Sequence, residues 1–99
     1  MGKLVDMEDI VGRTIRIEAI HFGTNQYDQE EVIFVGSVDG TNEVVEVSDA
    51  SWTVVVQGRN LRKSLPVSAT FVREPPPIYY RLIGPMGEDG KPAELPFGS

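Results

Sequence analysis

The chain contains no cysteine and a single histidine, His21. Without thiols there is no disulfide framework, thiolate metal site, iron–sulfur cluster or thiol nucleophile, so the core must hold by packing alone. A lone imidazole excludes most histidine-based metal and acid–base sites. The sequence also offers no phosphate-binding loop and no convincing pair of carboxylates. We therefore expect no metal, no cofactor and no enzyme activity.

Long apolar runs are missing as well. No uninterrupted run approaches the roughly 20 residues that a membrane-spanning helix needs. Residues 1–9 are short and acidic, whereas a secretory signal is basic and then apolar. We expect a protein of the cytoplasm, or of the host cytoplasm if it is viral, that has no membrane contact.

Charged residues are present, and they are distributed unevenly along the chain. Its 99 residues carry 15 Asp and Glu against 9 Lys and Arg, a net charge of −6, and this length builds one small domain. Overall acidity argues against nucleic-acid binding, which usually shows a basic footprint. Residues 50–83, however, hold 5 basic residues and 1 acid, whereas residues 1–49 hold 11 acids and 3 bases. A basic face on an acidic protein is therefore compatible with the composition.

Alternation of apolar and polar residues predicts β-structure along most of the chain. In the first pattern, Ile15 and Ile17 face one side while Arg16 and Glu18 face the other. Asp39-Gly40 predicts a hairpin turn, because both residues tolerate the positive φ that tight strand connections need. Five strands are predicted, over residues 12–20, 32–38, 43–47, 67–73 and 78–83.

The segment between the third and fourth predicted strands is ambiguous. Apolar residues over 49–63 fall close to helical spacing, whereas the β-prone run from Trp52 to Val56 and the helix-weakening Gly58 favour another structure. We predict a helix here, ended by Leu65-Pro66. Pro75 to Pro77 predicts a stiff extended connection. Residues 84–99, rich in glycine, proline and polar residues, predict a flexible acidic tail.

Three strands, a helix and two more strands is the element order of the OB-fold, an all-β barrel that binds oligonucleotides. We therefore predict an OB-fold of five antiparallel strands over residues 1–83, with one helix between strands 3 and 4. Residues 84–99 follow it as a flexible tail.

Three segments carry a recognisable pattern: VGRTIRI at residues 11–17, LPVSATFV at residues 65–72 and IYYRL at residues 78–82. They resemble small phage-type single-stranded DNA-binding proteins, which open with a "GKTI" strand and close with "LPVxATxV" and "YYxL" strands. The similarity spans about residues 9–83. The resemblance implies sequence-independent binding of single-stranded DNA in phage replication or recombination. It also implies that copies of this chain can form a homo-oligomer, since such proteins often assemble.

The tail carries a second resemblance. An acidic stretch followed by Glu94, Leu95, Pro96 and Phe97 is similar to the C-terminal tip of bacterial single-stranded DNA-binding proteins. That tip docks an apolar pocket on replication and repair proteins, so the resemblance implies that these four residues bind such partners. In that family the phenylalanine is the last residue, whereas two residues follow it here. An ordinary polar tail that contains the triplet by chance is the alternative.

Single-strand binding combines aromatic rings that stack on bases with cations that contact phosphates. The predicted binding residues are Arg16, Tyr27, Phe34, Arg73, Tyr79 and Arg81. Five of them have competing interpretations. Arg16 is placed to pair with Glu18 or Glu46, and Phe34 fits a core position. Tyr27 fits a plug at one end of the barrel, and Tyr79 and Arg81 fit a solvent-facing strand.

Other aromatic and basic residues are assigned structural places. Trp52 is expected as a lid on the core and Phe22 as a plug at one end of the barrel. Basic residues 59, 62 and 63 are expected on a solvated face, and His21 at the surface.

A different function class is also open. A small β-barrel that binds protein, such as a phage accessory or inhibitor factor, would use its acidic first half as the contact surface. Nothing in the chain resembles a helix that reads base edges, so any DNA binding is expected to be sequence-independent and strongly weakened by salt.

Overall fold

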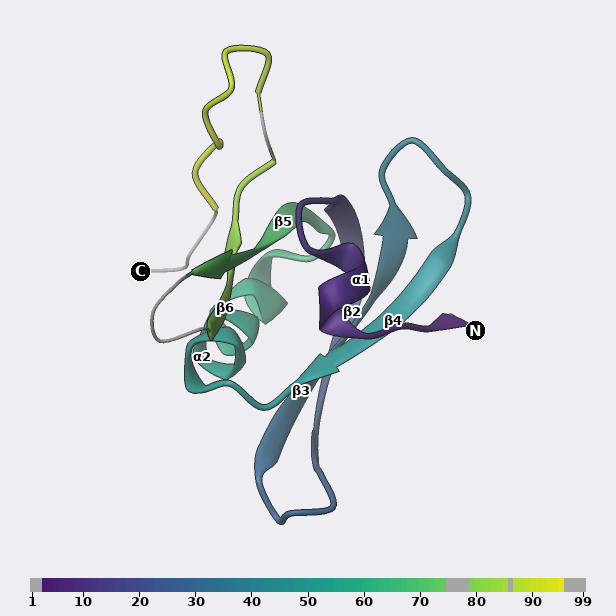
Figure 1. The fold of residues 1–99 in the computed structure, drawn as a ribbon, viewed down its shortest axis with the longest axis vertical. Helices are drawn as coiled ribbons and strands as arrows, with labels where there is room; N and C mark the ends of the chain where they lie inside the picture. The colour runs from purple at the N-terminus through teal and green to yellow at the C-terminus, as the bar shows by residue number, and fades with distance from the viewer. Residues whose placement is uncertain (1–2, 75–78, 86, 96–99) are drawn as a thin grey trace.

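The computed structural model describes residues 3–74, 79–85 and 87–95, with the Tyr79 side chain left out. One mixed sheet of six strands is accompanied by two α-helices and a short 3₁₀-helix (Figure 1). The elements are β1 (Lys3–Leu4), α1 (Met7–Ile10), β2 (Thr14–Thr24), β3 (Glu30–Val38), β4 (Val44–Asp49), α2 (Trp52–Leu61), η1 (Arg62–Ser64), β5 (Val67–Glu74) and β6 (Tyr79–Ile83).

The strands lie in the order β1-β4-β3-β2-β5-β6, which confirms a mostly β fold. The five predicted strands correspond to β2 through β6, and each of their pairings is antiparallel. An arrangement of only five antiparallel strands is not confirmed, because β1 joins β4 in parallel, with Lys3 beside Val45. Within the described residues no backbone pairing links β6 to β4, so the sheet is open.

Strand β2 is longer than its alternation pattern predicts. The expected loop from Phe22 onward begins only after Thr24, since Phe22 still pairs with Val32 of β3. A register shift between Ile17 and Ala19 changes the alternation. Because of this irregularity Ile17 and Ile20, three residues apart, are both buried.

The core contains buried apolar residues from each of the strands β2 to β6. Phe34 of β3 and Phe71 of β5 meet edge to face, with ring centroids 5.3 Å apart and an interplanar angle of 75°. Phe34 is only 1% exposed. A ring enclosed in this way has no face free to stack on a base, so its assignment to the DNA-binding set is corrected to a core role.

The predicted helix is present as α2, and its glycine has a packing reason. A Cβ on Gly58 would lie 2.7 Å from the Cγ2 atom of Val32, so only glycine lets α2 lie this close to β3. The residue that weakens the helix locally therefore allows it to pack. Trp52, at the start of α2, is 72% exposed, so its predicted place as a core lid is wrong.

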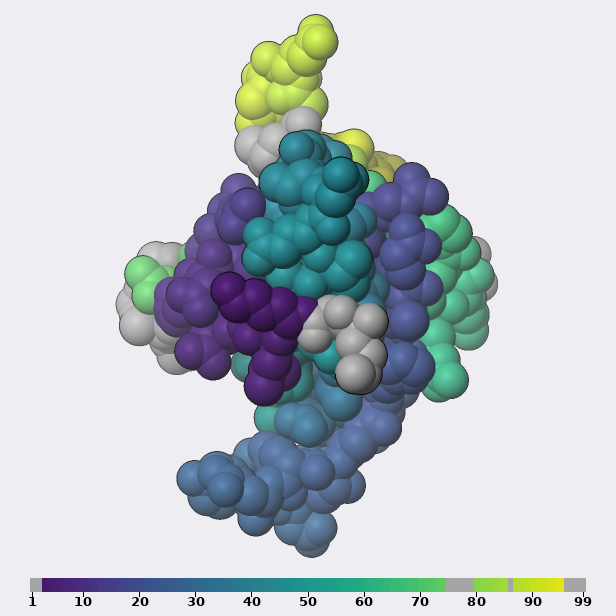
Figure 2. Space-filling model, turned by 90° about the vertical axis from the view of Figure 1, so that its right-hand side faces the viewer, coloured from purple at the N-terminus to yellow at the C-terminus, as the bar shows by residue number. Residues whose placement is uncertain are grey.

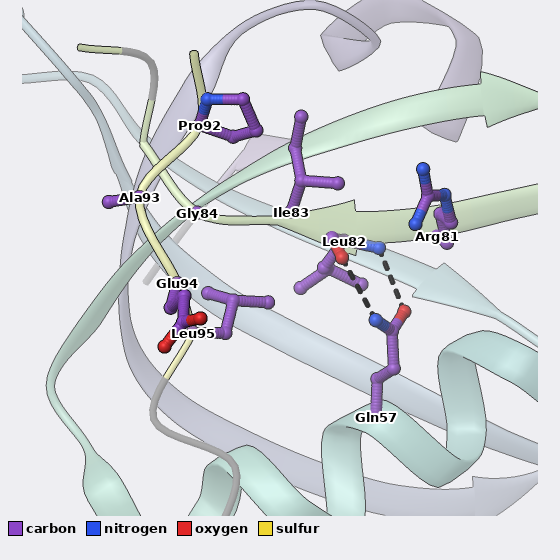
Figure 3. Close-up of a pocket in the computed structure, with 9 residues that line it drawn as sticks. All are labelled: Gln57, Arg81, Leu82, Ile83, Gly84, Pro92, Ala93, Glu94 and Leu95. Atoms are coloured by element: carbon purple, nitrogen blue, oxygen red, sulfur yellow. Dashed lines mark hydrogen bonds between the residues drawn. The ribbon is translucent and has the colours of Figure 1, made fainter.

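The outer edge of β6 is occupied by a side chain. The amide of Gln57 on α2 donates to the Leu82 carbonyl oxygen at 2.9 Å and accepts from the Leu82 N–H at 2.8 Å (Figure 3). These two bonds satisfy the backbone groups that a further strand would otherwise pair. These bonds attach helix α2 to the outer edge of the sheet, at Leu82 of β6.

Residues 84–85 and 87–95, the described part of the predicted tail, turn back on themselves. The N–H of Gly87 donates to the Lys91 carbonyl at 2.9 Å, and the N–H of Ala93 donates to the Pro85 carbonyl at 3.0 Å. Leu95 is partly buried against the core. This part of the tail therefore makes specific contacts with the domain.

Two further expectations from the sequence concern the proline-rich connection and membrane spans. The stiff connection predicted at Pro75 to Pro77 lies outside the described residues. None of the helices in the described ranges is long and apolar enough to cross a membrane.

Candidate functional site

The predicted DNA-binding arginines do not form one continuous strip. Arg73 pairs in register with Tyr80, and Arg81 is the next residue along β6, so Arg73 and Arg81 lie on opposite faces of the sheet. Arg16 shares the face of Arg81, because their partners Ser68 and Val72 are an even number of residues apart on β5. The Tyr79 side chain lies outside the described part of the structure.

Each of these arginines already has a carboxylate partner. The Arg16 Nε atom lies 2.9 Å from Glu18, Arg73 lies 3.0 Å from Glu8, and Arg81 lies 2.7 Å from Glu74, all at half-exposed positions. The predicted alternative for Arg16, a pair with Glu18, is confirmed. A phosphate would have to compete for each of these three cations.

Arg73 belongs to a cluster that holds α1 on the sheet, the Glu8 cluster, made of Glu8, Arg73 and Tyr80. The Glu8 carboxylate accepts hydrogen bonds from the Tyr80 hydroxyl and from the Arg73 guanidinium. The Tyr80 bond, and then Arg73, lower the pKa of Glu8, and the bond to Glu8 raises the pKa of Tyr80. Tyr80 packs against the core, and Met7 and Ile10 of α1 are buried. These contacts give Arg73 a structural role.

The connection between β2 and β3 presents Tyr27 to solvent. This connection, coloured blue, projects at the bottom of the molecule in Figure 2. The Asn25 side-chain oxygen accepts from the N–H groups of Tyr27 at 2.9 Å and Gln29 at 3.0 Å, which fixes the turn. Tyr27 is 73% exposed. The ring is therefore accessible, although the backbone that carries it is ordered by local bonds.

Beside this hairpin, α2 contributes a second exposed ring. The Arg59 guanidinium lies 6.0 Å from the centroid of the Trp52 ring, within the range of a cation–π contact. The same guanidinium forms an ion pair with Glu30, the first residue of β3. Arg59 therefore connects the exposed tryptophan to the base of the hairpin.

One helical turn further, a second arginine covers a second ring. The Arg62 guanidinium lies 5.6 Å from the centroid of Phe22, which is partly buried against the core. Arg59 and Arg62 are three residues apart and so share a helix face. Together these side chains form what we call the hairpin–helix cluster: Phe22, Glu30, Trp52, Arg59 and Arg62. Tyr27 is exposed on the connection that leads to Glu30.

Charge is divided within this region. Arg59, Arg62 and the exposed Lys63 come from α2 and η1, whereas the acids Glu30, Glu31 and Asp28 come from the hairpin. A basic helix face therefore lies against an acidic hairpin base.

An open groove of about 460 Å³ lies between α2, β6 and residues 92–95 (Figure 3). It brings Arg81 together with Glu94 and Leu95, two of the residues predicted to bind a partner protein. Glu94 is exposed, whereas the Leu95 side chain is turned toward Leu82 and partly buried. Pro96 and Phe97 lie outside the described residues.

Metal binding finds no support in the part of the chain that the structure describes, where no group of three His, Cys, Asp or Glu residues is placed to hold an ion. His21 is exposed on β2, as predicted.

Comparisons of the chain with family models, with curated proteins and with solved structures give no match. The strand order and the side-chain clusters are therefore the observations on which a function can be argued.

Sequence reasoning assigned Trp52 to the core and the basic residues of α2 to a solvated face. A helical pattern contained the missing signal, since Trp52 and Arg59 are seven residues apart, two turns along one face, with Arg62 three residues further. The ambiguity between helix and strand in this segment hid that face.

Proposed function

We propose that this protein binds single-stranded DNA without sequence preference and that the hairpin–helix cluster is its main contact surface. The order β4-β3-β2-β5-β6, with a helix between β4 and β5, supports an OB-fold assignment for the domain. In OB-folds the loop between the first two barrel strands contacts the ligand. The corresponding loop here is the one that exposes Tyr27.

The observation that carries this proposal is the exposed Trp52 ring beside Arg59, together with the exposed Tyr27 ring on the hairpin whose Glu30 pairs with that arginine. A base stacked on an aromatic ring contributes about 1–3 kcal/mol, and neighbouring cations contact the phosphates. Tyr27 and Trp52 are 73% and 72% exposed, and Arg59 lies over Trp52. This combination binds any base, because every base has a π-face.

The phage resemblance supplies the proposed setting, which is replication or recombination. The outer face that holds Arg16 and Arg81, with Tyr79 on the same strand, extends the proposed path of the DNA. Glu94, Leu95, Pro96 and Phe97 are proposed to recruit replication or recombination proteins, and Leu95 must leave its contact with the core to do so.

The test is a titration of labelled oligo-dT at about 50 mM salt and then at rising salt. Trp52→Ala and Tyr27→Ala are each expected to weaken binding about 5- to 150-fold, the equivalent of one lost stacking contact. Leu4→Ala is the matched control, because Leu4 is 75% exposed and lies on β1, away from the cluster. Tyr79→Ala and Arg81→Ala test the outer face in the same assay.

A protein-binding domain is the second candidate, and one observation favours it. The three arginines predicted to contact phosphates are each paired with a glutamate, which reduces the cationic surface open to DNA. The same titration separates the two candidates. If micromolar protein gives no signal change with oligo-dT at about 50 mM salt, DNA binding is overturned and protein binding is left.

A further inference from the structure

We propose that Glu30 occupies, in the free protein, the position on Arg59 that a backbone phosphate takes when a single strand binds. This inference rests on the proposed function and names the residues that tune the same site. Arg59 is then a phosphate-binding residue, and Glu30 is the residue that holds it in place and competes for it.

The chemistry of the two anions supports the exchange. A guanidinium presents five N–H donors in a planar fork, which matches carboxylates and phosphates alike. In the free protein Arg59 is ion-paired with Glu30 while it lies over Trp52. A base stacked on Trp52 would bring its phosphate to the same guanidinium.

The exposure of the pair allows the exchange to happen. The side chains of Arg59 and Glu30 are each 48% exposed, so a polyanion reaches the contact without disturbing the core. Surface ion pairs of this kind contribute only about 0–1 kcal/mol, which makes Glu30 a displaceable partner. Once displaced, its charge remains beside the phosphate and opposes binding.

Arg62 provides an internal contrast. Arg62 lies on the same helix face and over an aromatic ring, but it forms none of the ion pairs found among the described residues. Of the two arginines in the cluster, Arg59 is the one that is paired with a carboxylate in the described structure. Glu30 therefore acts on one defined cation of the site.

The experiment is a double-mutant cycle on fluorescein-labelled oligo-dT, measured by anisotropy at about 50 mM salt. It uses the full chain as wild type, Glu30→Gln, Arg59→Gln and the double variant. Glu30→Gln is expected to tighten binding about two- to five-fold, the range of one surface ion pair. Arg59→Gln is expected to weaken binding and to abolish the effect of Glu30→Gln. The gain should also shrink as salt is raised.

Glu43→Gln is the matched control. It removes one negative charge from an exposed residue between β3 and β4, outside the hairpin–helix cluster. Equal gains from Glu30→Gln and Glu43→Gln would reduce the effect to net charge and overturn the inference. A gain that persists in the Arg59→Gln background would also overturn it.

The two proposals fail in different ways. If wild type binds oligo-dT and Trp52→Ala weakens it, but the cycle shows no coupling, only the role of Glu30 is lost. If wild type does not bind, the proposed function is lost together with this inference.

Discussion

The Glu8 cluster and the hairpin–helix cluster contain the same kinds of residue in opposite arrangements. In the Glu8 cluster one carboxylate receives both the Tyr80 hydroxyl and the Arg73 guanidinium, and the ring packs on the core. In the hairpin–helix cluster Arg59 connects Glu30 to a tryptophan ring that is open to solvent. Residue type alone therefore does not distinguish the two clusters, whereas the burial of the ring does.

The sequence and the structure rank Arg73 and Arg59 differently as candidates for phosphate contact. Arg73 looked like a binding residue because it ends a strand beside a proline-rich connection, whereas Arg59 looked like ordinary helix surface. In the fold, Arg73 helps to fasten α1 to the sheet, and Arg59 lies beside an accessible aromatic face.

The largest expected effect separates a buried ring from an exposed one. Phe34→Ala removes a ring that is 1% exposed, so it should lower the free energy of unfolding by about 3–5 kcal/mol. Trp52→Ala should leave that free energy within about 0.5 kcal/mol, because surface substitutions rarely do more. Urea denaturation measures both. A Phe34→Ala protein of normal stability that no longer binds DNA would return Phe34 to the binding set.

A smaller effect separates the two arginines. Arg59→Gln should lower the slope of log affinity against log salt by about 0.7, the value for one phosphate contact on a single strand. Arg73→Gln should leave the slope unchanged and lower the thermal unfolding midpoint instead, since it loosens α1. Titrations at four or more salt concentrations give the slopes. Equal slope changes in the two variants would erase the distinction between the clusters.

The smallest effect concerns the pH dependence of the Glu8 cluster. Because the pKa of Glu8 is lowered in the folded state, the unfolded chain binds the proton more readily. Its contribution to stability is therefore present above the ordinary glutamate pKa of 4.5 and is lost as pH falls through the lower folded value. Urea midpoints measured from pH 7 down to pH 3 should fall less steeply for Glu8→Gln than for wild type.

Tyr80→Phe is the control for that series, because it keeps the packed ring and removes the hydroxyl that contributes most to the lowered pKa of Glu8. Like Glu8→Gln, it should make the urea midpoint fall less steeply as pH is lowered. If the urea midpoints of wild type and Glu8→Gln fall equally steeply, the cluster contributes nothing to the pH dependence of stability.

Much of the fold was predictable because its strands follow a simple alternation. Residues 32–38 bury every second side chain, and residues 12–20 and 67–73 do so over part of their length, at Ile15 and Ile17 and at Val67, Ala69 and Phe71. This period identifies them. The short N-terminal elements escaped because a four-residue helix, with Met7 and Ile10 buried, shows no measurable period. The extension of β2 escaped because a register shift breaks the alternation that would have revealed it.

The candidate site was less predictable because it depends on tertiary neighbours. Tyr27 was selected from its loop position, and it is exposed. The meeting of Arg59 with Glu30, 29 residues away in sequence, follows from the packing of α2 on β3, which local patterns do not encode. For the same reason the sequence did not predict the pairing of Arg73 with Glu8, which lies 65 residues away.

The Gln57 amide has a consequence for assembly. An outer strand with free N–H and C=O groups recruits strands from other molecules, which leads to edge-to-edge pairing and aggregation. Here the outer strand β6 meets a side chain that offers one donor and one acceptor at its centre, as a neighbouring strand would. A homo-oligomer that extends the sheet across β6 would have to displace this amide first. The Gln57 amide is therefore an obstacle to pairing across β6 at Leu82, and we expect assembly of this chain to use a surface other than that edge.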